Sequence, residues 1–129
     1  MRKTSVGLAG LLLGLALVAA ADEKAAPAET SLQGEVVDLH CYLTRGARGS
    51  DHAGCANACI GRGVTPGFVA DDGRVFLVLA ERPFSAKDLL AGLAGAPVRV
   101  RGTIVERDGV RGFQLKAAER VAAGAEAKD

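Results

Sequence analysis

Two Asp-Gly pairs constrain the fold of this chain more than any other feature of its sequence. Asp72-Gly73 and Asp108-Gly109 each separate two stretches that are rich in β-branched and other apolar residues. An Asp-Gly pair readily adopts the left-handed backbone conformations of a tight hairpin turn, so it is a strong local signal for two antiparallel strands. The sequence therefore predicts two β-hairpins, one in the middle of the chain and one near its C-terminal end.

The two hairpins supply four of the five expected strands, and one further strand precedes them. The five predicted strands comprise residues 32–39, 68–70, 74–80, a segment that follows Pro97, and 110–117 with a resumption at Val121. Gly34 is expected to form a β-bulge in the first strand. The run at 74–80 is continuously apolar, which predicts burial on both of its faces.

A helix is expected between the third and fourth strands. Ser85 can cap its start, with Asp88 three residues further on in a capping-box arrangement. Gly95 can end it. Its predicted apolar face consists of Leu89, Leu90 and Leu93.

This order of strands and helix resembles that of a known fold. A helix between the third and fourth strands of five is the order of the OB-fold, a partly open Greek-key barrel. From Leu32 to Val121 the chain resembles small exported bacterial OB-fold proteins, and VRVRGTIVERDGVRGFQL is similar to the last hairpin of such barrels. The resemblance implies a mainly β protein: a small five-stranded OB-fold-like barrel, with a helix between strands 3 and 4 and a short Cys/His-bearing helical insert after strand 1.

The insert has a resemblance of its own. Its segment from His52 to Cys59 has the pattern His-x-x-Cys-Ala-x-x-Cys, and it resembles a group of short exported proteins that share this pattern without a settled activity. Exported OB-fold proteins generally lack such an insert. The resemblance therefore implies the fold more than a particular role.

The N-terminal residues 1–21 have the features of a cleavable secretory signal. A basic start, Met1-Arg2-Lys3, is followed by an apolar run from Val6 to Val18 and by three small residues, Ala19-Ala20-Ala21. The run is short for a membrane span, which needs about 20 residues, although an uncleaved anchor is the alternative. We expect a periplasmic or secreted protein that meets the membrane only through its transient signal.

The rest of the chain is expected to be one domain. Residues 22–31 are predicted to be a flexible lead-in, 32–122 the OB-fold-like domain, and 123–129 a disordered tail. The chain has 16 Lys and Arg residues, two of them in the signal, against 15 Asp and Glu. This balance, with four Phe, one Tyr and no Trp, argues against a nucleic acid partner.

All three cysteines and both histidines of the chain lie between His40 and Cys59. Ser50 or Asp51 can begin a short helix in this segment, and Gly61 or Gly63 can end it. In that helix His52, Cys55 and Cys59 stand at positions i, i+3 and i+7, which share one face.

The residues on this helix face could form a metal site if Cys41, at the end of the first strand, lies close to them. Three thiolates and one imidazole form a closed tetrahedral set that suits Zn²⁺, and soft thiolates also suit Cu(I). His40 is a weaker candidate because it neighbours Cys41 on a strand and would point the other way. The expected ligands of a zinc or copper ion are therefore Cys41, His52, Cys55 and Cys59.

Two other interpretations of the cysteines stay open. An oxidising compartment favours a disulfide, from Cys41 to either Cys55 or Cys59, with one thiol left over. Thiol redox chemistry would need a lowered thiol pKa, to which the flanking arginines 45, 48 and 62 could contribute unless they are ordinary surface charges. Asp38 could orient a histidine ligand or bond to the backbone of the following loop.

The expected function is a non-enzymatic binding module that holds zinc or copper, either structurally or in metal handling. Its partner would be a metal ion or an unknown protein. No Ser-His-Asp set, paired carboxylates or Gly-rich phosphate loop can be recognised in the sequence. The alternatives are a thiol–disulfide redox protein and an OB-fold ligand- or partner-binding module with a disulfide-braced loop.

Overall fold

Five strands form a closed barrel in the computed structural model, which describes residues 27–122. The strands are β1 (Glu29–Asp38), β2 (Pro66–Ala70), β3 (Val75–Ala80), β4 (Pro97–Arg107) and β5 (Val110–Arg120). They follow one another around the barrel in the order β1-β2-β3-β5-β4. Only β3 and β5 pair in parallel, and the other neighbours are antiparallel. The predicted OB-fold-like barrel is confirmed; the signal predicted at 1–21 and the tail predicted at 123–129 lie outside the described residues.

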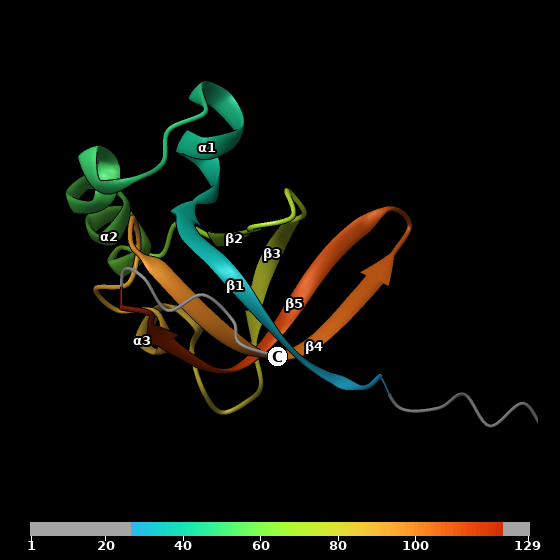
Figure 1. The fold of residues 1–129 in the computed structure, drawn as a ribbon. Helices are drawn as coiled ribbons and strands as arrows, with labels where there is room; N and C mark the ends of the chain where they lie inside the picture. Colours follow the sequence, from blue (N-terminus) through green and yellow to red (C-terminus); the bar gives the residue numbers. More distant parts are fainter. Residues whose placement is uncertain (1–26, 123–129) are drawn as a thin grey trace, which may run out of the picture.

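Short helices occupy two of the connections. Helix α1 (Leu39–Arg45), the 3-10 turn η1 (Ser50–His52) and α2 (Ala53–Gly61) lie between β1 and β2, and α3 (Ala86–Leu89) lies between β3 and β4. Figure 1 shows α1 and α2 at one end of the barrel, with the β4–β5 hairpin extending away from them. Within residues 27–122, none of the helices has the length and apolar character that a membrane span requires.

The first strand differs from its prediction in two ways. It begins at Glu29, because residues expected in the flexible lead-in pair with β4, Glu29 with Thr103 and Ser31 with Arg101. Gly34 forms no bulge and pairs regularly with both neighbouring strands. A Cβ at Gly34 would lie 2.1 Å from the Val69 carbonyl oxygen, so the glycine allows two strands to approach closely.

The predictions for two other elements, β3 and α3, were also wrong in part. Strand β3 is not buried on both faces: Phe76 and Val78 point into the barrel, whereas Leu79 on the outer face is 40% exposed. Helix α3 has only four residues, and the Ser85 side chain makes no capping hydrogen bond, so the expected capping box does not form. Leu90 is nevertheless buried in the core, which explains the apolar pattern without a longer helix.

The core is built around three phenylalanines. The Phe113 ring centroid lies 6.2 Å from that of Phe68 and 5.9 Å from that of Phe76. Ala56 and Ile60 of α2 belong to the same buried cluster. Because α2 is packed into the core rather than suspended in a loop, the residues at its start hold a fixed position on the barrel.

Candidate metal centre

Asp38 places the first group of the candidate site. It is the last residue of β1 and the N-cap of α1, and its Oδ1 accepts a hydrogen bond of 3.1 Å from the Cys41 backbone N–H. Cys41 is thus the third residue of a helix rather than the end of a strand, as the sequence had suggested. The capping bond brings the carboxylate beside the Cys41 side chain.

His52, the third residue of the candidate site, is the last residue of η1 and directly precedes α2. The Gly49 backbone N–H donates to the Glu35 carboxylate, which also pairs with Arg48 at 3.1 Å. Further along α2, the Asn57 amide donates to the Ala94 carbonyl and accepts from the Ala94 N–H, both at 3.2 Å. These contacts hold the segment from η1 into α2 against the barrel.

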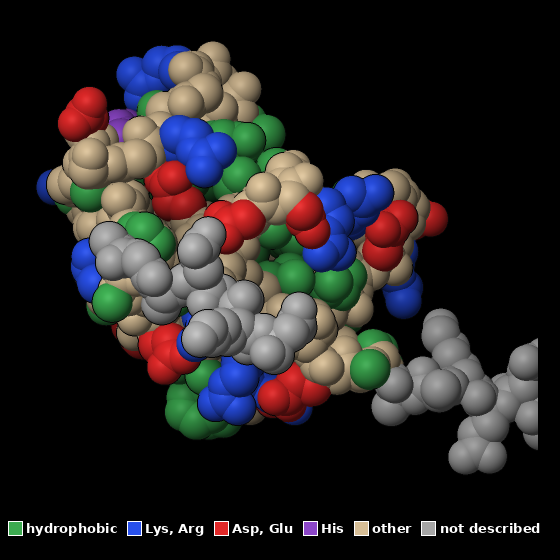
Figure 2. Space-filling view, in the orientation of Figure 1, with side chains coloured by type: hydrophobic (Ala, Val, Ile, Leu, Met, Phe, Trp, Pro, Cys, Tyr) green, Lys and Arg blue, Asp and Glu red, His purple; other side chains and the backbone are tan. Residues whose placement is uncertain are grey.

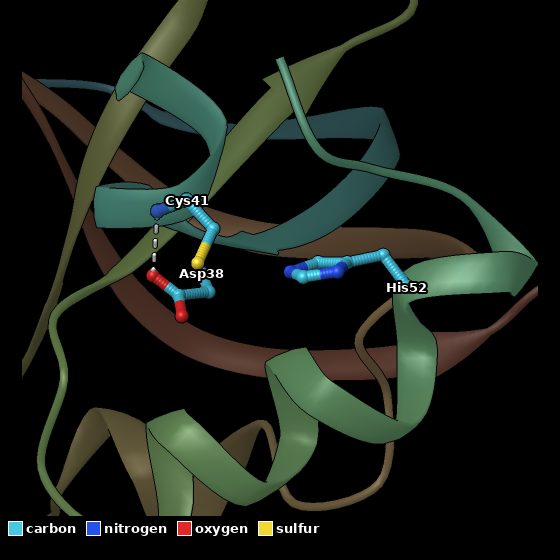
Figure 3. A group of neighbouring side chains, drawn as sticks. All are labelled: Asp38, Cys41 and His52. Atoms are coloured by element: carbon cyan, nitrogen blue, oxygen red, sulfur yellow. Dashed lines mark hydrogen bonds between the residues drawn. The ribbon is translucent and has the colours of Figure 1, made fainter. Parts of the chain in front are cut away.

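Asp38, Cys41 and His52 converge in the space between α1 and α2. One ligand atom from each lies within 4.8 Å of the other two, and Figure 3 shows the His52 ring directed toward the Cys41 sulfur and the Asp38 carboxylate. Asp38 is 1% exposed and Cys41 is 5% exposed. These three residue types can each donate one atom to a metal ion, so the group is a candidate metal site.

One ring nitrogen of His52 lacks the hydrogen-bond partner that a buried polar atom normally has. Nε2 is buried and has no hydrogen-bond partner among the described residues. Buried polar atoms in folded proteins are normally hydrogen-bonded, so an exception calls for a missing partner. An imidazole nitrogen in this state is available to a metal ion.

Asp38 is held as a carboxylate. Burial raises its pKa, but hydrogen bonds from the Cys41 backbone N–H and from the thiols of Cys59 and Cys41 outweigh burial and leave the pKa below its usual value. The hydrogen bond to Asp38, together with burial and the nearby Cys55, raises the pKa of the Cys59 thiol. A negative charge therefore persists at the centre of the group at neutral pH.

The two cysteines of α2 lie outside the three-residue group. Cys55 is exposed and Cys59 is partly buried, and all three cysteines, which lie within the described residues, are free thiols rather than disulfides. Of the four ligands predicted from the sequence, the structure brings Cys41 and His52 together. Cys59 influences the group by helping to lower the pKa of Asp38.

Two residues of α1, Arg45 and His40, lie close to Cys41 in the sequence. Arg45, one turn further along α1, donates a hydrogen bond of 2.8 Å from Nη2 to the Cys41 sulfur. His40, which precedes Cys41 on α1 rather than on a strand, is exposed and lies outside the three-residue group. The Arg45 guanidinium beside the sulfur partly balances the negative charge of Asp38.

Asp38 is the site residue that sequence reasoning ranked too low. Of its two predicted roles, the bond to the following backbone is confirmed, and the same side chain also belongs to the converging group. The available signal was the spacing Asp-x-x-Cys at the end of a strand. An N-cap side chain and the third residue of the helix are neighbours, so this spacing places a carboxylate next to a thiol.

Comparison of the chain with protein-family models, with curated proteins and with solved structures finds no match.

Proposed function

We propose that this chain is an exported binding module that holds a zinc ion through Asp38, Cys41 and His52 at the α1–α2 end of the barrel. One observation carries the proposal: a buried imidazole nitrogen without a hydrogen-bond partner belongs to a ring that faces a buried carboxylate and a buried thiol. A cation at this point would supply the missing partner. It would also offset the cost of burying the carboxylate.

The donor atoms favour zinc over copper. Carboxylate oxygen, imidazole nitrogen and thiolate sulfur are all ordinary Zn²⁺ ligands. Cu(I) prefers thiolate and thioether sulfur, for which the Asp38 oxygen is a poor substitute. The mixed set is therefore better suited to zinc.

The number of ligands favours metal handling over a purely structural role. Structural zinc sites are normally closed by four protein ligands, whereas sites with three keep a position for another ligand. The three converging groups leave such a position, and an exposed cysteine lies on the neighbouring helix. We assign the fourth position to an exchangeable ligand.

Metal content tests the proposal. The chain purified anaerobically and loaded with Zn²⁺ should retain about one zinc per chain after gel filtration, and the His52→Ala and Cys41→Ser variants should lose it. His40→Ala is the matched control, because it removes an exposed histidine next to Cys41 and should leave the zinc content unchanged. Equal zinc content in His52→Ala and wild type would refute the site.

Thiol–disulfide exchange is the second candidate function, and the contact between Arg45 and the Cys41 sulfur favours it. A neighbouring guanidinium stabilises a thiolate, which is the reactive form. Purification without bound metal, together with a defined disulfide in the mass spectrum, would favour this function over zinc binding.

Export and partner choice are parts of the same proposal. Sequencing the N-terminus of the protein recovered outside the cytoplasm should show cleavage near Ala21, and an intact Met1 would indicate an anchor instead.

Figure 2 shows acidic and basic side chains interspersed over the visible face, in keeping with pairs such as Arg99–Glu119 and Arg111–Glu106. This mixed surface supports a protein or metal partner over nucleic acid, whose binders concentrate basic charge.

A further inference from the structure

The three cysteines form a series that runs from the solvent to the buried group. Cys55 is exposed, Cys59 is partly buried, and Cys41 is buried. Thiols in a metal site that serves only stability would all be expected to bind the ion and to be shielded together. The graded exposure instead suggests that the outer two thiols have a different task.

Contacts connect the members of this series. Cys55 and Cys59 lie one turn apart on α2, so their side chains project from the same face of the helix. Interaction with Asp38 and with Cys55 raises the pKa of the Cys59 thiol, and Asp38 belongs to the converging group. The two thiols of α2 therefore share one face of the helix, and the less exposed of them interacts with the Asp38 carboxylate.

The surface around Cys55 allows another molecule to approach. Gly54 and Ala58, which flank Cys55 on α2, are small and exposed. The opposite side of α2 is fixed by Ala56 and Ile60 in the core. A donor molecule can thus reach the Cys55 sulfur while the helix stays in place.

We propose that Cys55 and Cys59 form a transfer arm, through which zinc passes between an external thiolate ligand and the Asp38–Cys41–His52 group. This inference rests on the proposed zinc site. In the entry step the Cys55 thiol loses its proton to water as its sulfur binds the ion, and the external zinc–sulfur bond breaks and that thiolate takes up a proton. Zinc remains Zn²⁺ throughout, so the exchange needs no oxidant or reductant.

A covalently linked second thiol explains why such an arm speeds exchange. Once zinc is bound at Cys55, the Cys59 sulfur is present at an effective concentration in the millimolar range. A free ligand at micromolar concentration competes poorly with it. An arm of this kind accelerates entry and exit equally and leaves the equilibrium affinity of the inner group unchanged.

The test is the rate of zinc exchange in Cys55→Ser. Zinc release to a chromophoric chelator and zinc uptake from a thiol-bound zinc complex are followed by stopped flow, on wild type and variant. We expect both rates to fall about tenfold or more, with the zinc content and dissociation constant unchanged. Ala58→Ser is the control, because it adds a hydroxyl at an exposed position on the same helix and should leave both rates as in wild type.

Two outcomes would overturn the transfer arm while leaving the zinc site intact. Unchanged rates in Cys55→Ser would show that zinc enters by another route. Faster release with a weaker dissociation constant would show that Cys55 is a permanent ligand. Failure of wild-type protein to bind zinc would instead overturn the proposed function itself, so the two failures are distinguishable.

Discussion

Asp38 combines two roles that can be separated by substitution. Its carboxylate caps α1 through the Cys41 N–H, and the same side chain belongs to the group that faces His52. Asparagine and aspartate are about equally good N-cap residues, but only aspartate supplies a charged metal ligand. The capping role thus depends on shape and hydrogen bonding, and the metal role depends on charge.

Asp38→Asn should therefore lower zinc affinity by about 10-fold or more and change the metal-free stability little. Asp38→Ala should have the same effect on zinc and also lower the free energy of unfolding by about 1 kcal/mol through loss of the cap. Calorimetric zinc titration and urea unfolding of both variants check this. Full zinc affinity in Asp38→Asn would restrict Asp38 to capping.

Protonation of Asp38 and Cys59 makes the stability of the metal-free chain depend on pH. The pKa of Asp38 is lowered on folding, so its stabilising contribution is present above the unfolded value of about 3.9 and is lost as pH falls through the folded value. The pKa of Cys59 is raised, so its contribution is complete below the unfolded value of about 8.5 and is lost as pH rises through the folded value. We expect urea midpoints, measured with chelator and reductant present, to fall at both limits.

Cys59→Ser identifies the alkaline change in stability. Serine does not titrate in this range, so the variant should lose less stability than wild type as pH rises above about 8.5. An identical alkaline decrease in the variant would assign the effect to another group.

At the scale of elements, the packing of one glycine controls the position of α2. Gly95 has a φ of +75°, and a Cβ there would lie 2.5 Å from the Ala53 Cβ and 2.7 Å from the Gly49 carbonyl oxygen. Both atoms belong to the segment that carries His52. A side chain at 95 would therefore push this segment away from the barrel.

Gly95→Ala should destabilise the protein by more than Gly109→Ala does, because a clash adds to the cost of the left-handed backbone, and it should weaken zinc binding by displacing His52. Gly109→Ala is the matched control: its φ is +82°, but a Cβ there meets no atom within 4 Å. That variant should show only the cost of the left-handed backbone, about 1–2 kcal/mol, with unchanged zinc affinity. Thermal unfolding and zinc titration of the two variants distinguish strain from displacement.

The elements that could be predicted are those with local signals. Asp108-Gly109 forms its hairpin with both residues at positive φ, as its dipeptide chemistry requires. Helix α1 was missed because its cap, Asp38, directly follows an apolar strand, and the seven residues LHCYLTR have no helical apolar period of their own. The close approach at Gly34 was mistaken for a bulge, since a glycine in a strand has both meanings and only the neighbouring strands decide between them.

On the scale of the whole molecule, the class of barrel was predictable because a helix between the third and fourth of five strands resembles the OB-fold. The candidate site was only partly predictable. Spacing along one helix groups His52 with Cys55 and Cys59, but the converging set depends on how β1, α1 and η1 meet in space. No periodicity within a segment contains that information.

The small core makes the fold sensitive to its central aromatic ring. Phe113 is fully buried between Phe68 and Phe76, and replacing such a ring with alanine costs about 3–5 kcal/mol. Because domains of this size are stable by only about 5–15 kcal/mol, Phe113→Ala should lose much of its stability in denaturant unfolding. Val110→Ala, at an exposed position, is the comparison and should remain close to wild type.

Strand β1 pairs with β2 through residues 34–38 and with β4 through residues 29–35, so the ring of strands closes along its length. The same strand ends at Asp38. An ion held there would join the end of this strand to α1 and to the turn that precedes α2. Because only the folded chain brings these three groups together, unfolding of the barrel would require the ion to leave. Amide protons along the β1–β4 ladder would consequently exchange with deuterated water more slowly once zinc is bound.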